Sequence, residues 1–112
     1  SLGEVSFHSK EMEIVQDADR LDAIGAIGIA RAFSFGGNKG REMYNPNVPV
    51  QEYKDKEAYK HSEAPTINHF YEKLLLLKNK MNTEAAKRIA AHRHDYMLSF
   101  LDEFMAEWNG KK

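Results

Sequence analysis

The sequence predicts an all-α fold, and two observations support this. Apolar residues recur at spacings of three and four in three long stretches of the 112-residue chain, which places them on one face of a helix. Residues that favour turns gather between these stretches, chiefly within 36–65. The length suits one small domain and leaves little room for two, so residues 1–112 are expected to form a single domain.

The first predicted helix spans residues 12–35. Its apolar positions cover most of its circumference, which is typical of a helix that is buried on all sides. Gly25 and Gly28 lie inside it, although glycine costs roughly 1 kcal/mol relative to alanine in a helix. We therefore expect these glycines to allow another helix to approach closely. The pair Gly36-Gly37 is expected to end the helix.

The following residues, 36–65, are expected to form a long loop. A charged piece at 51–61 interrupts it and is a candidate for a weak helix. The segment 36–41 is rich in glycine and basic residues, which leaves open that it closes over phosphate groups. It lacks the spacing of a P-loop, so that motif is excluded.

Two further helices are predicted after the loop. Thr66 is the expected N-cap of a helix over 67–80, and Asn82 or Thr83 is the expected N-cap of a helix that runs to Trp108. Gly110 is expected to mark the end of the last helix. The expected core residues are Phe70, Leu74 and Leu77 in the shorter helix and Ile89, Ala90, Met97, Phe100, Leu101, Phe104 and Trp108 in the longer one, whose apolar stripe is interrupted only by Arg93.

Composition disfavours several functional classes. A net charge of −1 and a pI near 6.5 give no support for binding to nucleic acid or to a membrane surface. No apolar run approaches the length of a membrane span. Residues 1–4 lack the features of a signal peptide, and the chain has no cysteine, so a cytoplasmic location is expected.

Three carboxylates, Asp17, Asp19 and Asp22, lie near the start of the first predicted helix. Asp19 and Asp22 share a helix face, whereas Asp17 lies about 200° around the helix from Asp19. Carboxylates on one buried face repel each other unless a cation or a basic side chain lies between them. The pattern therefore leaves a metal site and a salt-bridged structural cluster as open interpretations.

Two other carboxylate motifs do not match this cluster. An EF-hand loop beginning at Asp17 would need an oxygen ligand, a glycine and a glutamate at its fifth, sixth and twelfth positions. Those positions hold Leu21, Asp22 and Gly28. An aspartyl-nucleophile phosphatase would place its Asp-x-Asp motif after a buried strand, whereas the residues after Asp19 continue a helical spacing.

The segment 15–31 contains the run Asp-Ala-Asp-Arg-Leu-Asp-Ala-Ile-Gly-Ala-Ile-Gly, which resembles the final motif of a bacterial and fungal branch of HD-superfamily hydrolases. Segments 35–37, 68–75 and 81–84 agree with the same branch. The resemblance covers residues 14–108, and its first motif is long and specific.

Proteins of this family are all-α and bind a divalent metal ion through a histidine, a His-Asp pair and a distant aspartate. The resemblance assigns that aspartate to Asp19, as metal ligand and catalytic residue, within a helical HD-domain-like fold. The implied metal ion is manganese, magnesium, iron or zinc. The implied reaction is hydrolysis of a phosphate ester or anhydride by metal-bound water, and the resemblance implies nucleotides as the substrate class. Asp22 is a candidate second catalytic residue that orients this water.

Three residues are candidates for substrate binding. His69 and Lys73 share a face of the second predicted helix, within a segment that resembles the family. Close to Asp19, they would bind and neutralise phosphate, and the alternative is an ordinary surface pair. Arg20 either binds phosphate or forms a structural ion pair with Asp17 or a glutamate.

The family's remaining metal ligands precede the final aspartate, where this chain has only His8 and no His-Asp pair. His94-Asp95 follows Asp19, in the opposite order, and is expected to lie on a solvated helix face. We therefore expect the chain to be the C-terminal portion of an HD hydrolase domain and to be inactive alone. The alternative is a non-catalytic helical fragment or partner-binding module, which would expose apolar surface.

Overall fold

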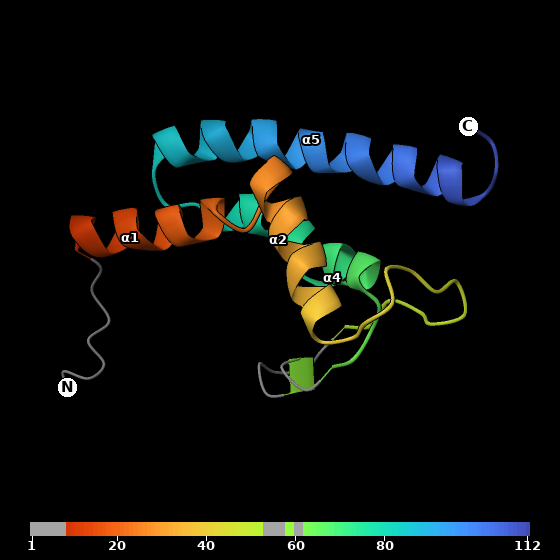
Figure 1. Ribbon diagram of the computed structural model, residues 1–112. Coiled ribbons are helices and arrows are strands. Elements are labelled where there is room, and N and C mark those ends of the chain that lie inside the picture. The colour runs from red at the N-terminus through yellow and green to blue at the C-terminus, as the bar shows by residue number, and fades with distance from the viewer. Residues whose placement is uncertain (1–8, 53–57, 60–61) are drawn as a thin grey trace.

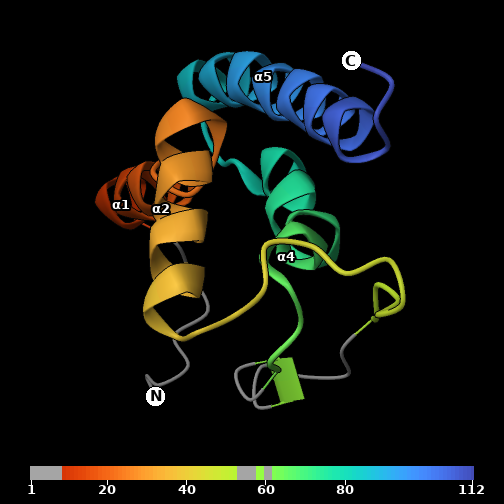
Figure 2. The same cartoon turned by 45° about the vertical axis from the view of Figure 1, so that its right-hand side comes forward.

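The computed structural model describes residues 9–52, 58–59 and 62–112 of the chain. All of its elements are helical, as the sequence predicts. They are α1 (Lys10–Leu21), α2 (Gly25–Asn38), α4 (Thr66–Glu72), the 3₁₀ helix η1 (Leu74–Lys80) and α5 (Glu84–Trp108). Figures 1 and 2 show α5 lying across one end of α2, with α4 beside α2. Within the described residues, no helix has the length and apolar character needed to span a membrane.

Two sequence predictions fall partly outside the described residues. His8 is not among them. Of the weak helix expected at 51–61, residues 51–52 and 58–59 are described; residues 51–52 are not helical, and residues 58–59 are.

The single helix predicted over 12–35 is wrong, because the chain turns between α1 and α2. The N–H of Ala23 donates to the carbonyl of Arg20 at 3.1 Å, and the N–H of Ile24 donates to the carbonyl of Leu21 at 3.3 Å. These bonds tighten the last turn of α1. Ile24 is extended, and Gly25 takes a φ of +73°, a value that residues other than glycine rarely adopt. The helical spacing of apolar residues runs unchanged across this turn and hides it.

Gly25 lies directly against Arg93 of α5. A Cβ atom at Gly25 would lie 2.8 Å from Cγ of Arg93, so the expected close approach of another helix is confirmed at this position. Nη1 of Arg93 donates to the carbonyl of Leu21 at 2.9 Å. The guanidinium thus satisfies a carbonyl at the end of α1 and complements the negative end of its dipole. At Gly28 the neighbour is instead the backbone of Ala23, in the turn itself.

The expectation that residues 12–35 are buried on all sides is also wrong. Val15 of α1 is 67% exposed and Ile27 of α2 is 63% exposed. Only Ile24 of the large apolar residues in this segment is fully buried. Neighbouring helices cover only part of the circumference of α1 and α2, so a pattern that is apolar all round leaves apolar side chains at the surface.

The core lies between α5, α4 and η1, where the predicted apolar stripes meet. Ile89 and Trp108, at 43% and 47% exposure, are predicted core residues that lie at the surface instead. Phe33 of α2 contacts Phe70 and Phe100 with ring centres 5.9 Å apart, which ties α2 to α4 and α5. The buried apolar residues are Ile24, Ile67, Phe70, Leu74, Leu77, Met81, Ala86, Ala90, Met97 and Leu101.

The helix predicted over 67–80 is interrupted at Lys73, where α4 ends and the 3₁₀ helix η1 begins. Lys73 has a φ of −141° and a ψ of −53°, which lie outside the helical range. The predicted core residues Phe70, Leu74 and Leu77 are nevertheless buried on both sides of the break. The spacing of three and four fits both helix types, so the sequence pattern does not distinguish them.

Thr66 is not the N-cap of α4, as the sequence predicts. Pro65 occupies that position and forms no side-chain capping bond. The free donors at the start of the helix are satisfied by the preceding loop: the N–H groups of Thr66 and Ile67 donate to the carbonyls of Glu42 and Met43, each at 2.9 Å. This pairing fixes the loop after α2 against the start of α4.

The predicted end of a helix at Gly36-Gly37 is wrong, because α2 continues to Asn38. Gly40 has a φ of +72°, and its N–H donates to the carbonyl of Gly37 at 3.1 Å. The N–H of Arg41 donates to the carbonyl of Gly36 at 2.8 Å, which completes a Schellman motif. The motif fixes the backbone of Arg41 at the end of α2. At the end of α5, Gly110 also has a positive φ, as predicted.

Asp17 joins α1 to the start of α5. It is 3% exposed. Its Oδ1 accepts from the N–H of Asn82 at 2.7 Å, and its Oδ2 accepts from the N–H and the hydroxyl of Thr83 at 2.9 and 2.8 Å. Thr83 is the N-cap of α5, as predicted, and its hydroxyl oxygen accepts from the N–H of Ala86. One carboxylate therefore satisfies donors at the start of α5 and holds its capping residue in place.

The pKa of Asp17 reflects this setting. Burial raises the pKa, but the hydrogen bonds from Asn82 and Thr83 and the charge of Arg20 outweigh burial, so the pKa lies below its ordinary value. The stabilisation is complete above the ordinary aspartate pKa of about 4 and is lost as the pH falls below it.

Asp17→Asn should lower the melting temperature by roughly 5–10 °C at pH 7, because the neutral amide cannot accept all three hydrogen bonds of the carboxylate. Thermal unfolding followed by circular dichroism measures this change. Asp19→Asn is the matched control, since Asp19 is exposed on the same helix. Equal melting temperatures for the two variants would contradict the structural role of Asp17.

Gly25→Ala should destabilise the protein by about 1–2 kcal/mol or more, because the left-handed backbone at this position is unfavourable for a residue with a Cβ, and the new Cβ would also meet Arg93. Gly37→Ala is the control, since Gly37 lies in α2 with no atom within 4 Å of the added Cβ. We expect that variant to be stabilised by roughly 0.5–1 kcal/mol. Urea unfolding of both variants tests the pair, and similar changes would show that Gly25 is not conformationally required.

Candidate functional site

Asp19 and Asp22 are exposed on α1, on the side away from Asp17. Because Asp17 is fixed inward by α5, Asp19 points outward, about 200° around the helix. Asp22 is the C-cap of α1 and keeps near-helical dihedral angles, with φ −68° and ψ −14°. The two carboxylates are therefore three positions apart at one exposed end of the helix.

The described residues contain no group of three histidine, cysteine, aspartate or glutamate side chains close enough to hold a metal ion. Asp19 and Asp22 offer carboxylate oxygens, which suit a hard divalent ion, but they do not complete a coordination sphere. Two carboxylates at one end of a helix do not form a metal site by themselves, so the role of Asp19 as a metal ligand stays a prediction.

Arg20 lies beside these carboxylates but contacts the backbone. Its Nη1 donates to the carbonyl of Lys80, at the end of η1, at 2.6 Å. Its charge also lowers the pKa of Asp17. These contacts join α1 to η1, which agrees with the structural interpretation of Arg20. A role for Arg20 in substrate binding stays a prediction.

His69 and Lys73 lie together on α4 and share a third side chain, Tyr59. The rings of Tyr59 and His69 stack with centres 5.4 Å apart and planes 19° apart, and the Tyr59 hydroxyl lies 3.3 Å from Nε2 of His69. Nζ of Lys73 lies 5.6 Å from the centre of the Tyr59 ring. The shared helix face expected from the sequence is thus occupied by a compact group of three side chains.

The pKa of His69 is lowered to about 4 by burial, by Lys73 and by Arg41. Its imidazole is therefore neutral at pH 7. Arg41, from the end of α2, is linked to this group through Ser62, because it donates to the carbonyl of Ser62, whose N–H donates to the carbonyl of Tyr59. Sequence reasoning missed Tyr59, which lies in a charged piece without a motif. It found Arg41 only as part of a basic loop.

Arg41 is held by two further contacts. Its Nη2 donates to the carbonyl of Ser62 at 3.0 Å, and its guanidinium lies 5.2 Å from the centre of the Phe35 ring. Lys39 lies 5.7 Å from the same ring. A cleft of about 320 Å³ opens beside these cations and is lined by Lys39, Gly40, Arg41, Glu42 and Glu63.

The predicted site residues thus fall into two groups on different elements. Asp19 and Asp22 lie on α1, which packs against α5, whereas His69 and Lys73 lie on α4, which packs against α2 and η1. Among the described residues, no hydrogen bond or ion pair joins the two groups. Phosphate binding by His69 and Lys73 was expected only if they lie close to Asp19. That proximity stays a prediction.

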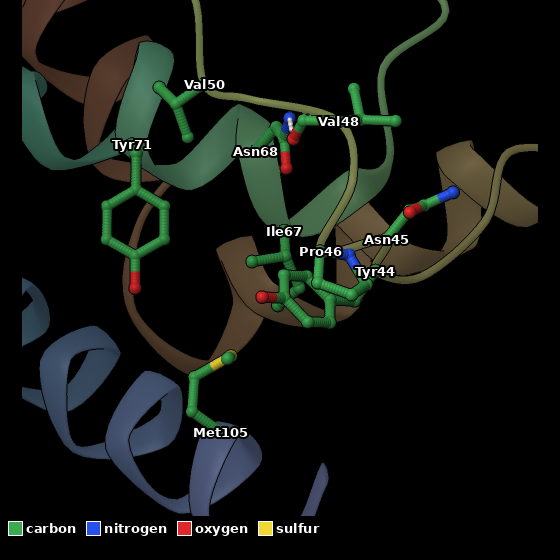
Figure 3. Close-up of a pocket in the computed structure, with 9 residues that line it drawn as sticks. All are labelled: Tyr44, Asn45, Pro46, Val48, Val50, Ile67, Asn68, Tyr71 and Met105. Atoms are coloured by element: carbon green, nitrogen blue, oxygen red, sulfur yellow. Dashed lines mark hydrogen bonds between the residues drawn. The ribbon is translucent and has the colours of Figure 1, made fainter. Parts of the chain in front are cut away.

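A second cavity, of about 190 Å³, lies between the segment 44–50 and α4, with Met105 of α5 at its edge (Figure 3). Buried Asn68 holds its wall in place, because its Nδ2 donates to the carbonyls of Val48 and Pro49 at 3.1 and 3.3 Å. The side chains around it are mainly apolar and aromatic. None of the site residues predicted from the sequence lines this cavity.

The His94-Asp95 pair differs in part from its expected solvated position. Asp95 is exposed, but His94 is half-buried, and its Nδ1 is buried without a hydrogen-bond partner among the described residues. Burial and the charge of Lys78 lower the pKa of His94. The expectation overlooked η1, which brings Lys78 close to this face of α5.

The chain is similar to known bacterial proteins in both sequence and structure. No family model matches the chain. The chain is 47% identical over 93 residues to the uncharacterized protein YpgQ of Bacillus subtilis. The aligned residues make up 83% of this chain and 38% of YpgQ. A crystal structure from Lactobacillus plantarum matches with a TM-score of 0.86 and 50% identity, covering 94% of this chain and 52% of that chain.

One structural relative is named as a hydrolase. An HD-superfamily hydrolase from Bacillus thuringiensis matches with a TM-score of 0.74 and 48% identity, covering 96% of this chain and 58% of the hydrolase. These relatives support an HD-like family for this chain. The structure of YpgQ in complex with ADP matches with a TM-score of 0.72 and 40% identity, over 95% of this chain and 48% of YpgQ. The chain thus spans about half the length of these structures.

The low pKa of His69 predicts a pH-dependent stability. Because the unfolded chain binds a proton near pH 6.5 and the folded chain only near 4, stability should fall by up to about 3 kcal/mol as the pH drops through this window. Urea unfolding at pH 7, 6, 5 and 4 measures the loss. His69→Gln should reduce it, whereas His92→Gln, at an exposed position on α5, should not. The same pH dependence in both variants would contradict the assignment.

Proposed function

We propose that this chain contributes one part of a metal-dependent phosphohydrolase of the HD superfamily, corresponding to the C-terminal portion of its hydrolase domain, and that the substrate is a nucleotide. The observation that carries the proposal is the similarity to an HD-superfamily hydrolase over 96% of this chain, at 48% identity. The all-α fold agrees with it.

The placement of α1 supports Asp19 as the metal ligand from this chain. The buried carboxylate of Asp17 fixes the rotation of α1 about its own axis. Asp19 is therefore exposed at a defined position, and Asp22 lies at the same end of the helix. A rigid helix positions a metal ligand better than a loop does.

A bound divalent ion would supply an activated water and polarise a phosphoryl oxygen. In this proposal, the Asp19 carboxylate holds the ion and the Asp22 carboxylate accepts a hydrogen bond that orients a water molecule. Manganese, magnesium, iron and zinc all accept such carboxylate ligands. The histidine ligands typical of the family would come from residues outside those described.

The group on α4 supports phosphate as the recognised part of the substrate. Lys73 supplies a positive charge, and the neutral imidazole of His69 supplies one N–H donor. The complex of YpgQ with ADP supports a nucleotide as the substrate class. Hydrolysis of a nucleotide phosphate ester or anhydride is the reaction that fits both the carboxylates on α1 and the phosphate-binding side chains at α4.

The exposed apolar surface favours a second candidate, a non-catalytic module that binds a partner. Ile14, Val15 and Ile27 are each more than half exposed on α1 and α2. A module of this kind would bind a hydrophobic dye or self-associate when purified and would show no metal-dependent hydrolysis. Light scattering and dye fluorescence, measured together with the hydrolysis assay, distinguish it from the enzyme.

Asp19→Ala should reduce metal-dependent hydrolysis of nucleoside triphosphates by the purified protein by about a hundredfold or more, because a ligand of the catalytic ion is lost. Phosphate release in the presence of manganese measures the rate. Asp95→Ala is the matched control, since Asp95 is an exposed aspartate on α5 outside both groups. Undiminished hydrolysis in Asp19→Ala would refute the assignment of Asp19.

A further inference from the structure

Three side chains, those of Tyr59, Lys73 and Arg41, lie around His69. Tyr59 stacks on the His69 ring, and Lys73 is the C-cap of α4, four positions after His69. Arg41 comes from the end of α2, where the Schellman motif fixes its backbone. Nζ of Lys73 lies 5.6 Å from the centre of the Tyr59 ring, and Arg41 donates to the carbonyl of Ser62, whose N–H donates to the carbonyl of Tyr59. Both cations lower the pKa of His69. The group is therefore built by tertiary packing and not by one helix face.

The charges of this group favour an anion. Arg41 and Lys73 create a positive potential at an imidazole that is neutral at pH 7. Two carboxylates, Glu42 and Glu63, line the cleft beside Arg41. The Glu42 carboxylate accepts from Nδ2 of Asn45 at 3.1 Å, which directs it toward the loop. An anion bound beside His69 would be attracted by both cations and would form charge-assisted hydrogen bonds with them.

A hydrogen bond from Tyr59 would favour the tautomer of His69 whose Nδ1–H can donate to such an anion. The Tyr59 hydroxyl lies 3.3 Å from Nε2, and a phenol is a better hydrogen-bond donor than a neutral imidazole N–H. When Tyr59 donates to Nε2, the ring proton is on Nδ1. Nδ1–H then serves as a donor for an oxygen of the anion. Tyr59 is a positioning residue in this arrangement, because it acts through His69.

We infer that Arg41, His69 and Lys73 form one binding site for a phosphate group, in which Tyr59 fixes the imidazole tautomer. The inference rests on the proposed function for the identity of the phosphate, which is then that of the nucleotide. The site itself requires no metal ion. It adds Arg41 and Tyr59 to the residues that the sequence indicated.

The test is a titration of the metal-free purified protein with inorganic phosphate, followed through the ring nitrogens of His69 by ¹H–¹⁵N NMR. Free protein should show protonated Nδ1 and unprotonated Nε2. Phosphate should shift these signals in a saturable manner and raise the pKa of His69, because an anion stabilises the imidazolium. Absence of a saturable shift would overturn the inference.

Arg41→Gln and Lys73→Gln should each weaken phosphate binding about tenfold or more. Arg88→Gln, at an exposed arginine on α5, should leave it unchanged. Because Arg41 also bonds to Ser62 and its variant can disturb the loop, Lys73 provides an independent test at an exposed position. Unchanged affinity in both variants would show that phosphate binds elsewhere and overturn the site.

Tyr59→Phe preserves the ring stacking and removes the hydroxyl. It should convert His69 to a mixture of tautomers, visible in the nitrogen shifts, and weaken phosphate binding severalfold. Unaltered nitrogen shifts would refute the role of Tyr59. A parallel titration with ADP identifies the source of the phosphate: tighter binding of ADP indicates a nucleotide, and equal affinity indicates free phosphate.

Failure of this site and failure of the proposed hydrolase are distinguishable. Phosphate binding without metal-dependent hydrolysis would retain the anion site and refute the enzyme. Hydrolysis that depends on Asp19, with no phosphate response at His69, would retain the enzyme and refute the anion site.

Discussion

The buried carboxylate of Asp17 determines how α1 sits in this structure. It accepts hydrogen bonds from two consecutive backbone N–H groups and from the hydroxyl of Thr83, the residue that caps α5. A buried carboxylate without such partners would be strongly unfavourable, so α1 cannot rotate without losing this compensation. The outward direction of Asp19 is a consequence of this contact.

The C-terminal end of α1, one turn beyond Asp17, is fixed by two arginines. Arg93 donates to the carbonyl of Leu21, and Arg20 donates to the carbonyl of Lys80. Both satisfy backbone acceptors at helix ends, which would otherwise remain unpaired. Gly25 allows the stem of Arg93 to reach this position, because no side chain stands in its way. Buried and half-buried polar groups thus determine the geometry around the acidic residues, and apolar packing holds α2, α4 and α5 together.

The two groups of candidate residues differ in how they are built. Asp19 and Asp22 are neighbours in sequence on one helix, so their relation depends on local structure alone. Arg41, Tyr59, His69 and Lys73 come from segments up to 32 positions apart and meet only because the loop after α2 pairs with the start of α4. Mutations in that loop would therefore affect the second group and leave the first unchanged.

The sequence by itself determined the all-α class, the stripe of Phe70, Leu74 and Leu77, a cap of α5 at Asn82 or Thr83 and the shared face of Asp19 and Asp22, because these depend on spacing and on short-range bonds. Tertiary structure decided the break between α1 and α2, the 3₁₀ geometry of η1 and the exposure of the first helical segment. Apolar spacing is the same in a straight helix and a turned one, and in α and 3₁₀ helices. Only contacts with distant residues, such as that of Arg93 with Leu21, select among these alternatives.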